Sequence, residues 1–147
     1  MINNKQVYQD VANLHIEAIK TGFLPTLGVK FLSLMYQCLD EASTTTLIVK
    51  YKGDHLSGFV SGSLGTTSLY RPMLSRPFAL CSALLPAMFS INKIRKILAI
   101  LSHTAGSKRA GYPKAELLTI CVSTLSRRQG LANNLYNSLQ IYFKSKK

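Results

Sequence analysis

The sequence is poor in acidic residues, cysteine, proline and glycine. Of its 147 residues only 6 are Asp or Glu, whereas 18 are Lys or Arg, so the formal net charge is +12. With 9 Gly, 5 Pro and 3 Cys, the composition excludes collagen and disulfide-rich scaffolds. Hydrophobic residues make up 47% of the chain, which excludes wholesale disorder and is enough for a packed core. We therefore expect a single domain over residues 1–147.

A secretory leader and long apolar runs are also missing. The chain begins with a polar stretch, M-I-N-N-K-Q, that lacks the apolar centre of a signal peptide. The longest uncharged apolar stretch, residues 77–92, is too short to span a bilayer comfortably and contains Pro86. Three cysteines cannot all pair, so a reducing compartment is the default. The sequence thus predicts a cytoplasmic protein without a membrane-spanning helix.

The positive charge is confined to the second half of the chain. Residues 1–70 contain five basic and five acidic residues, whereas residues 71–147 contain thirteen basic residues and one acid, Glu116. This asymmetry favours an anionic partner: a nucleic acid, an acidic membrane surface or a phosphorylated cofactor. The alternative is a solvated basic surface without a partner. Because a recognition motif and interleaved aromatic residues are both absent, we expect no specific nucleic-acid partner.

The pattern of the first half predicts two helices followed by a β-hairpin. Apolar residues first recur at helical spacing, and β-branched and alternating residues then take over. The expected elements are helices over residues 7–20 and 29–41 and strands over residues 44–51 and 55–63. Gly53 supplies the hairpin turn, and Gly58 and Gly62 mark bulges or close backbone approaches in the second strand.

The second half begins with a helical segment that is interrupted by proline. Residues 69–101 mix apolar and basic residues, and Pro72, Pro77 and Pro86 divide them into short helices. We interpret the segment as a helical insertion packed on the domain. The alternative is a basic amphipathic surface that makes peripheral contact with a membrane or a lipid-linked substrate. Residues 102–114 predict a polar loop.

The end of the chain predicts a strand, a short connection and a helix. Residues 115–123 are strongly apolar, which predicts a buried and central strand. Residues 130–143 predict a helix. The residues expected on its apolar face are Leu131, Leu135, Leu139 and Tyr142.

The junction between that strand and helix, R-R-Q-G-L-A, predicts a phosphate cradle. Gly130 allows a tight turn, and the N–H groups at a helix start carry the positive end of the helix dipole. Arg127 and Arg128 add charge just before them, so an anion would be held mainly by main-chain amides. The junction is neither a Walker A loop nor a dinucleotide-binding G-x-G-x-x-G motif.

Neither a metal site nor a nucleophile is predicted. His15, His55 and His103 do not stand at metal-ligand spacing to the cysteines. Cys121 lies in the middle of a predicted strand, which favours a buried small hydrophobe over a reactive thiol.

The strand–turn–helix unit resembles the GNAT superfamily of acyl-CoA-dependent N-acyltransferases. The family signature, [Q/R]-x-x-G-x-[G/A] after a buried strand, is matched by Arg127, Gly130 and Ala132. The order of elements before it agrees, and the L-G-x-x-F-L stretch from Leu27 to Leu32 is similar to a bacterial subgroup with a helical insertion. The resemblance covers nearly the whole chain. It implies an α/β (α+β) fold in which helices flank a central mixed, mostly antiparallel sheet.

This resemblance implies an N-acetyltransferase that moves an acetyl group from acetyl-CoA to a primary amine of a small molecule or amino sugar. Glu116 would act as the general base after partial burial raised its pKa; the alternative is an ion pair with Lys114 or an arginine. The main chain of the strand would pair with the pantetheine arm and polarise the thioester. The residues implied for the cofactor are Ile120, Cys121, Val122, Arg127, Arg128, Gln129, Gly130, Leu131 and Ala132.

The family continues after this helix with a strand, a helix and a hairpin, which carry its usual tyrosine general acid. The present chain stops at K-S-K-K, so we expect a fragment, a truncated product or a sheet that a partner chain completes. An unpaired edge over residues 117–122 would favour a homodimer. The competing hypotheses are a non-catalytic binding module with the same fold and a basic binder of anionic surfaces or nucleic acid.

Overall fold

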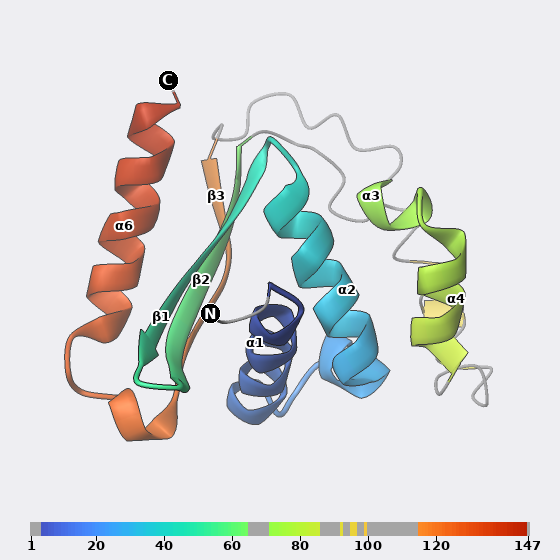
Figure 1. The fold of residues 1–147 in the computed structure, drawn as a ribbon, viewed down its shortest axis with the longest axis horizontal. Coiled ribbons are helices and arrows are strands. Elements are labelled where there is room, and N and C mark those ends of the chain that lie inside the picture. Colours follow the sequence, from blue (N-terminus) through green and yellow to red (C-terminus); the bar gives the residue numbers. More distant parts are fainter. Residues whose placement is uncertain are drawn as a thin grey trace.

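The computed structural model of the chain describes residues 4–64, 71–85 and 115–146, together with Asn92, Arg95, Lys96 and Ala99 (Figure 1). In this part of the chain the fold is mixed α+β. The elements are α1 (Asn4–Ala18), η1 (Leu24–Leu27), α2 (Gly28–Glu41), β1 (Thr45–Lys52), β2 (His55–Leu64), α3 (Arg71–Leu74), α4 (Pro77–Leu84), β3 (Ala115–Val122), η3 (Thr124–Ser126) and α6 (Leu131–Ser145). The described strands form an antiparallel sheet in the order β1–β2–β3, so the mixed pairing implied by the family resemblance is not seen among them.

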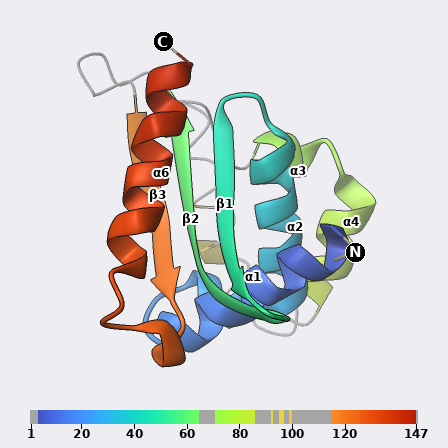
Figure 2. The same ribbon diagram turned by 60° about the vertical axis from the view of Figure 1, so that its left-hand side comes forward.

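The described elements form layers on both sides of this sheet. α6 covers one face, α1 and α2 cover the other, and α4 packs on α2 farther out (Figures 1 and 2). Successive side chains of a strand point to opposite faces of the sheet, so neighbouring residues of β2 contact different helix layers. Phe59 meets Tyr36 of α2 with ring centroids 5.2 Å apart, whereas the next residue, Val60, packs with Leu135 of α6.

The two N-terminal helices and the hairpin confirm the sequence prediction, with ends that differ by a few residues. The apolar residues that recur at helical spacing in α1 and α2 are buried or half-buried, and the core extends beyond them, because α2 is covered by α1, the sheet and α4. Large side chains outside this spacing are therefore buried as well. These are Tyr8, Leu32 and Tyr36.

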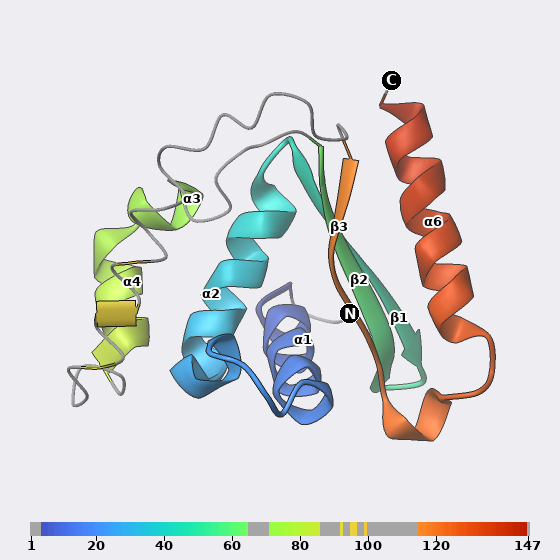
Figure 3. The same cartoon turned by 180° about the vertical axis from the view of Figure 1, so that it is seen from behind.

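β3 is a strand, as predicted, but its predicted burial is wrong. Among the described residues it pairs with β2 alone, so it forms one edge of the sheet (Figure 3). Glu116 is exposed, Leu117 is 43% exposed, and Cys121 is the one buried residue of β3. The apolar composition correctly indicated a strand, but composition does not determine how many neighbours a strand has.

α3 and α4 confirm the predicted division at Pro77, whereas Pro72 lies within α3 and Pro86 lies outside the described residues. Pro77 is the first residue of α4, where its missing N–H costs no helical hydrogen bond. Met73 and Ala83 are buried in the core that α2 shares, so this part of the insertion packs on the domain. Most of residues 86–101 and all of the predicted loop 102–114 lie outside the described residues. None of the helices that the structure describes is long and apolar enough to cross a membrane.

α6 lies close to the sheet because β2 has glycine where the helix crosses it. A Cβ atom added at Gly62 would lie 2.7 Å from Phe143 Cζ and 2.9 Å from Leu139 Cδ1. At Gly58 it would lie 2.9 Å from the main-chain oxygen of Cys121. These distances are shorter than van der Waals contact, which confirms the predicted close approaches. Phe143, rather than the predicted Tyr142, is the buried residue at this end of the helix.

A buried polar pair joins α1 to α2. His15 Nδ1 lies 2.6 Å from the hydroxyl of Tyr36, and the two side chains are 3% and 0% exposed. The Tyr36 hydroxyl also hydrogen-bonds to Thr119 of β3. Burial lowers the pKa of His15 below its ordinary value, because the charged imidazolium is poorly solvated there. The fold therefore holds His15 in its neutral form.

We expect Gly62→Ala to lower the free energy of unfolding by about 1–3 kcal/mol, because the added methyl group overpacks the contact with α6. Urea denaturation measures the loss. Phe143→Leu removes the nearest atom, so a double-mutant cycle should show that the two substitutions are less harmful together than their sum. Strict additivity would contradict the contact.

We expect the stability of the protein to fall as the pH drops below about 6.5, the ordinary pKa of histidine. Because the folded-state pKa of His15 is lowered, the unfolded chain takes up the proton first. Stability is therefore fully present above the unfolded-state pKa and is lost as the pH falls toward the folded-state value. Urea midpoints measured across this range should show a smaller slope for His15→Gln, whereas the exposed control His55→Gln should keep the wild-type slope. Equal slopes in all three proteins would refute the assignment.

Candidate phosphate-binding site

The candidate site lies where β3 ends and α6 begins. The chain passes through the single turn of η3 and then places two residues of one short loop in the left-handed region. Gly130 has φ 74°, as the predicted tight turn requires, and Arg128 has φ 61°. Left-handed backbone is open to glycine but strained for arginine, and such strain is concentrated at functional sites. The sequence contained no signal for the conformation of Arg128.

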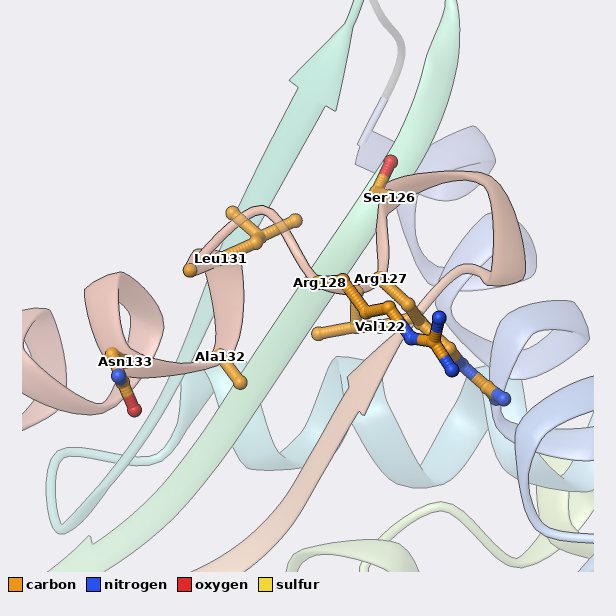
Figure 4. Close-up of a pocket in the computed structure, with 8 residues that line it drawn as sticks. Val122, Ser126, Arg127, Arg128, Leu131, Ala132 and Asn133 are labelled. Atoms are coloured by element: carbon orange, nitrogen blue, oxygen red, sulfur yellow. The ribbon is translucent and has the colours of Figure 1, made fainter.

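A pocket of about 240 Å³ adjoins this loop. It combines the end of β3, the loop and the first turn of α6, and Figure 4 shows both arginine side chains extending in the same direction. Its lining residues are Val122, Ser126, Arg127, Arg128, Gly130, Leu131, Ala132 and Asn133. The structure therefore brings together most of the residues predicted for phosphate binding.

The start of α6 has no side-chain cap. Gly130 is the N-cap residue and has no side chain to bond the first amides. The first N–H that bonds back within the helix is that of Asn134, which donates to the carbonyl oxygen of Gly130 at 3.1 Å. The N–H groups before it have no intrahelical acceptor and carry the positive end of the dipole. An anion in the pocket would satisfy them.

The side chains of the loop divide into two groups. Arg127 and Arg128 are exposed at the pocket, and Arg127 Nε also donates to the carbonyl oxygen of Val122 at 3.4 Å. Gln129 instead donates from Nε2 to the carbonyl oxygen of Leu125 at 3.2 Å, which braces the loop. The Gln129 side chain therefore supports the cradle, whereas the arginines supply its charge.

The outer edge of β3 offers main-chain groups beside the pocket. The Ser123 N–H donates to the carbonyl oxygen of Ser57 at 2.9 Å, and Cys121 pairs with Phe59 in the same ladder. Alternate residues of an antiparallel strand point their main-chain groups to opposite sides. The main chain of Cys121 is consequently turned toward β2. The main chain of Ile120 and Val122 faces the outer edge, where β3 pairs with no other described strand.

A bulge interrupts β3 farther from the pocket. The register steps from Ser61–Thr119 to Gly62–Leu117, so Leu118 is an extra residue without a partner on β2. Bulges redirect main-chain and side-chain groups and are common next to active sites. Here the bulge lies between the pocket and Glu116.

Glu116 lies apart from the pocket, near the opposite end of β3. Val122 lies six positions farther along the strand, which corresponds to about 20 Å of extended strand. Its carboxylate is exposed, so the predicted partial burial is wrong, and no described cation forms an ion pair with it. Lys114, one of the partners considered, lies outside the described residues.

Cys121 confirms the prediction of a buried small hydrophobe. Its side chain is 4% exposed and belongs to the core on the α1 and α2 side of the sheet. Burial raises the pKa of its thiol to about 11, with Arg127 opposing the shift, so the reactive thiolate is scarce at neutral pH. The strand thus meets the pocket with its main chain and not with a nucleophile.

Metal chemistry has no support in the described part of the chain. No group of three or more His, Cys, Asp or Glu side chains is placed there to hold an ion. Comparison with known proteins adds no further guide to the site: no family model matches the chain, and no curated protein or solved structure matches it either.

Proposed function

We propose that the protein is an N-acyltransferase of the GNAT type that transfers an acetyl group from acetyl-CoA to a primary amine. The observation that carries the proposal is the uncapped start of α6, flanked by Arg127 and Arg128, at the end of a strand whose outer edge no other described strand pairs with. This combination suits a ligand that has an anionic head and a long arm rich in amides. Acetyl-CoA has that chemistry.

The pyrophosphate would occupy the pocket at the start of α6. The main-chain N–H groups from Arg128 to Ala132 would donate to its oxygens, and the two guanidinium groups would balance its charge. The pantetheine amides would then bond to the main chain of Ile120 and Val122 as an added strand does. The same edge cannot also pair with a second copy, so this proposal assigns it to the cofactor rather than to a homodimer. A cytoplasmic location is a separate part of the proposal.

The extended arm would bring the thioester toward the bulge and the beginning of β3, where Glu116 lies. A main-chain N–H at the bulge would stabilise the oxyanion that forms when the amine attacks the acetyl carbon. The tetrahedral intermediate would collapse by breaking the carbon–sulfur bond, releasing the CoA thiolate. Glu116 would accept the proton that the amine loses.

Acetyl-CoA binding tests the cofactor site directly. At a ligand concentration about 100 times the Kd, binding should stabilise the fold by about 2.7 kcal/mol, a rise of several degrees in Tm. Gly130→Asp should abolish this rise, because it places a carboxylate beside the phosphates. The isosteric but neutral Gly130→Asn should retain most of it.

Asp and Asn both tolerate the left-handed backbone at position 130. A difference in binding between the two variants therefore reports the added negative charge and not a loss of folding. A folded wild-type protein with no change in Tm would reject the proposed cofactor. Equal binding by both variants would place the ligand elsewhere.

Glu116→Gln tests the proposed base. It should leave the acetyl-CoA affinity unchanged and lower the rate of CoA thiol release by about 10²–10⁴-fold, as expected for loss of a general base. Turnover would be followed with a panel of primary amines and amino sugars. An unchanged rate would remove Glu116 from the mechanism, and cofactor binding without thiol release from any amine would favour the non-catalytic module.

A further inference from the structure

A second pocket, of about 220 Å³, lies between the end of β1 and the start of α6. Two exposed lysines of β1, Lys50 and Lys52, line it. The residue between them, Tyr51, donates from its hydroxyl to Asp10 of α1 at 2.9 Å and so points to the α1 side of the sheet. Because successive side chains of a strand point to opposite faces, both lysines project on the side of α6.

Buried polar residues form the wall of this lysine pocket. Ser57 and Ser126 both line it, and each is only 8% exposed. Ser57 has no partner on β1, so it is the extra residue of a bulge in β2, a feature that is common next to active sites. Its carbonyl oxygen accepts the Ser123 N–H at 2.9 Å, which ties the hairpin to the end of β3. The main chain therefore fixes the wall of the pocket, and the lysines supply its charge.

The positive charge around the start of α6 is unbalanced among the described residues. No described acidic residue lines the lysine pocket or the pocket beside Arg127 and Arg128. Neither Lys50 nor Lys52 forms an ion pair with a described residue, and the first turn of α6 contains no acid. Asp54, the acid nearest to these lysines in sequence, does not line the lysine pocket. This surface therefore favours a multiply charged anion.

The two pockets adjoin, because Ser126 and Leu131 line both of them. We propose that Lys50 and Lys52 form a second phosphate site, which takes a phosphate monoester. Resting on the proposed function, this ligand is the phosphate on the ribose of acetyl-CoA, which is separate from the pyrophosphate. A phosphate monoester is nearly doubly charged at neutral pH and so matches two ammonium groups. The side-chain amide of Asn134, which also lines the lysine pocket, adds a hydrogen-bond donor.

Calorimetric titration with acetyl-CoA and with acetyl-dephospho-CoA, which lacks only the ribose phosphate, tests this site. The wild type should bind the dephospho form about tenfold more weakly. Lys50→Gln/Lys52→Gln should bind acetyl-CoA about tenfold more weakly than the wild type and should bind the two ligands equally. Lys20→Gln/Lys30→Gln is the matched control, because it removes the same charge at exposed positions that line neither pocket, and it should discriminate like the wild type.

A titration with inorganic phosphate, followed by NMR, separates this site from the proposed function. Phosphate should shift the backbone amides of Lys52 and Ser126 in the wild type and not in the folded Lys50→Gln/Lys52→Gln variant. These shifts without binding of either CoA ester would reject the proposed function but retain the phosphate site, with free phosphate as its ligand. Equal affinity of the wild type for both esters would overturn the assignment to the ribose phosphate, and so would discrimination that the double variant retains. Absence of the phosphate shifts together with absence of discrimination would overturn the site itself.

Discussion

The structure depends on how closely α6 approaches the sheet. Gly58 and Gly62 present no side chain on either side of Val60 on the face of β2 that α6 crosses, so Leu135, Leu139 and Phe143 pack close to the strand itself. This contact fixes the axis of the helix over β2 and sets its first turn beside the end of β3 (Figure 2). The position of the candidate phosphate cradle follows from it, because that cradle consists of main-chain groups that cannot move independently of the helix.

β3 connects the cradle to the rest of the core. One of its faces belongs to the α1 and α2 layer, through the buried Cys121 and the hydrogen bond from Thr119 to Tyr36. Its inner edge completes the ladder with β2, and its outer edge is open among the described residues. The core therefore positions the strand through one face and its inner edge. In the proposed function the core aligns the outer edge before acetyl-CoA binds, which reduces the entropic cost of ordering it.

Sequence periodicity predicted the helices and strands of this fold, but it did not predict which elements pack beside each of them. α1, α2, the hairpin and α6 have local signals, and Gly58 and Gly62 correctly indicated a close approach. The exposure of Glu116 depends on what flanks β3, which composition does not encode, and the left-handed Arg128 depends on how the loop closes onto α6. The buried His15–Tyr36 pair joins residues 21 positions apart, so no local sequence pattern predicted it.

The central claim is that one open strand edge and one helix start bind the same cofactor. The most direct test is to follow backbone amide resonances by NMR while acetyl-CoA is added. The amides from Arg128 to Ala132 should shift strongly, and those of Ile120 and Val122 should shift more than those of Thr119 and Cys121, whose main chains face β2. Shifts that miss the start of α6, or that follow β3 without this alternation, would contradict the account.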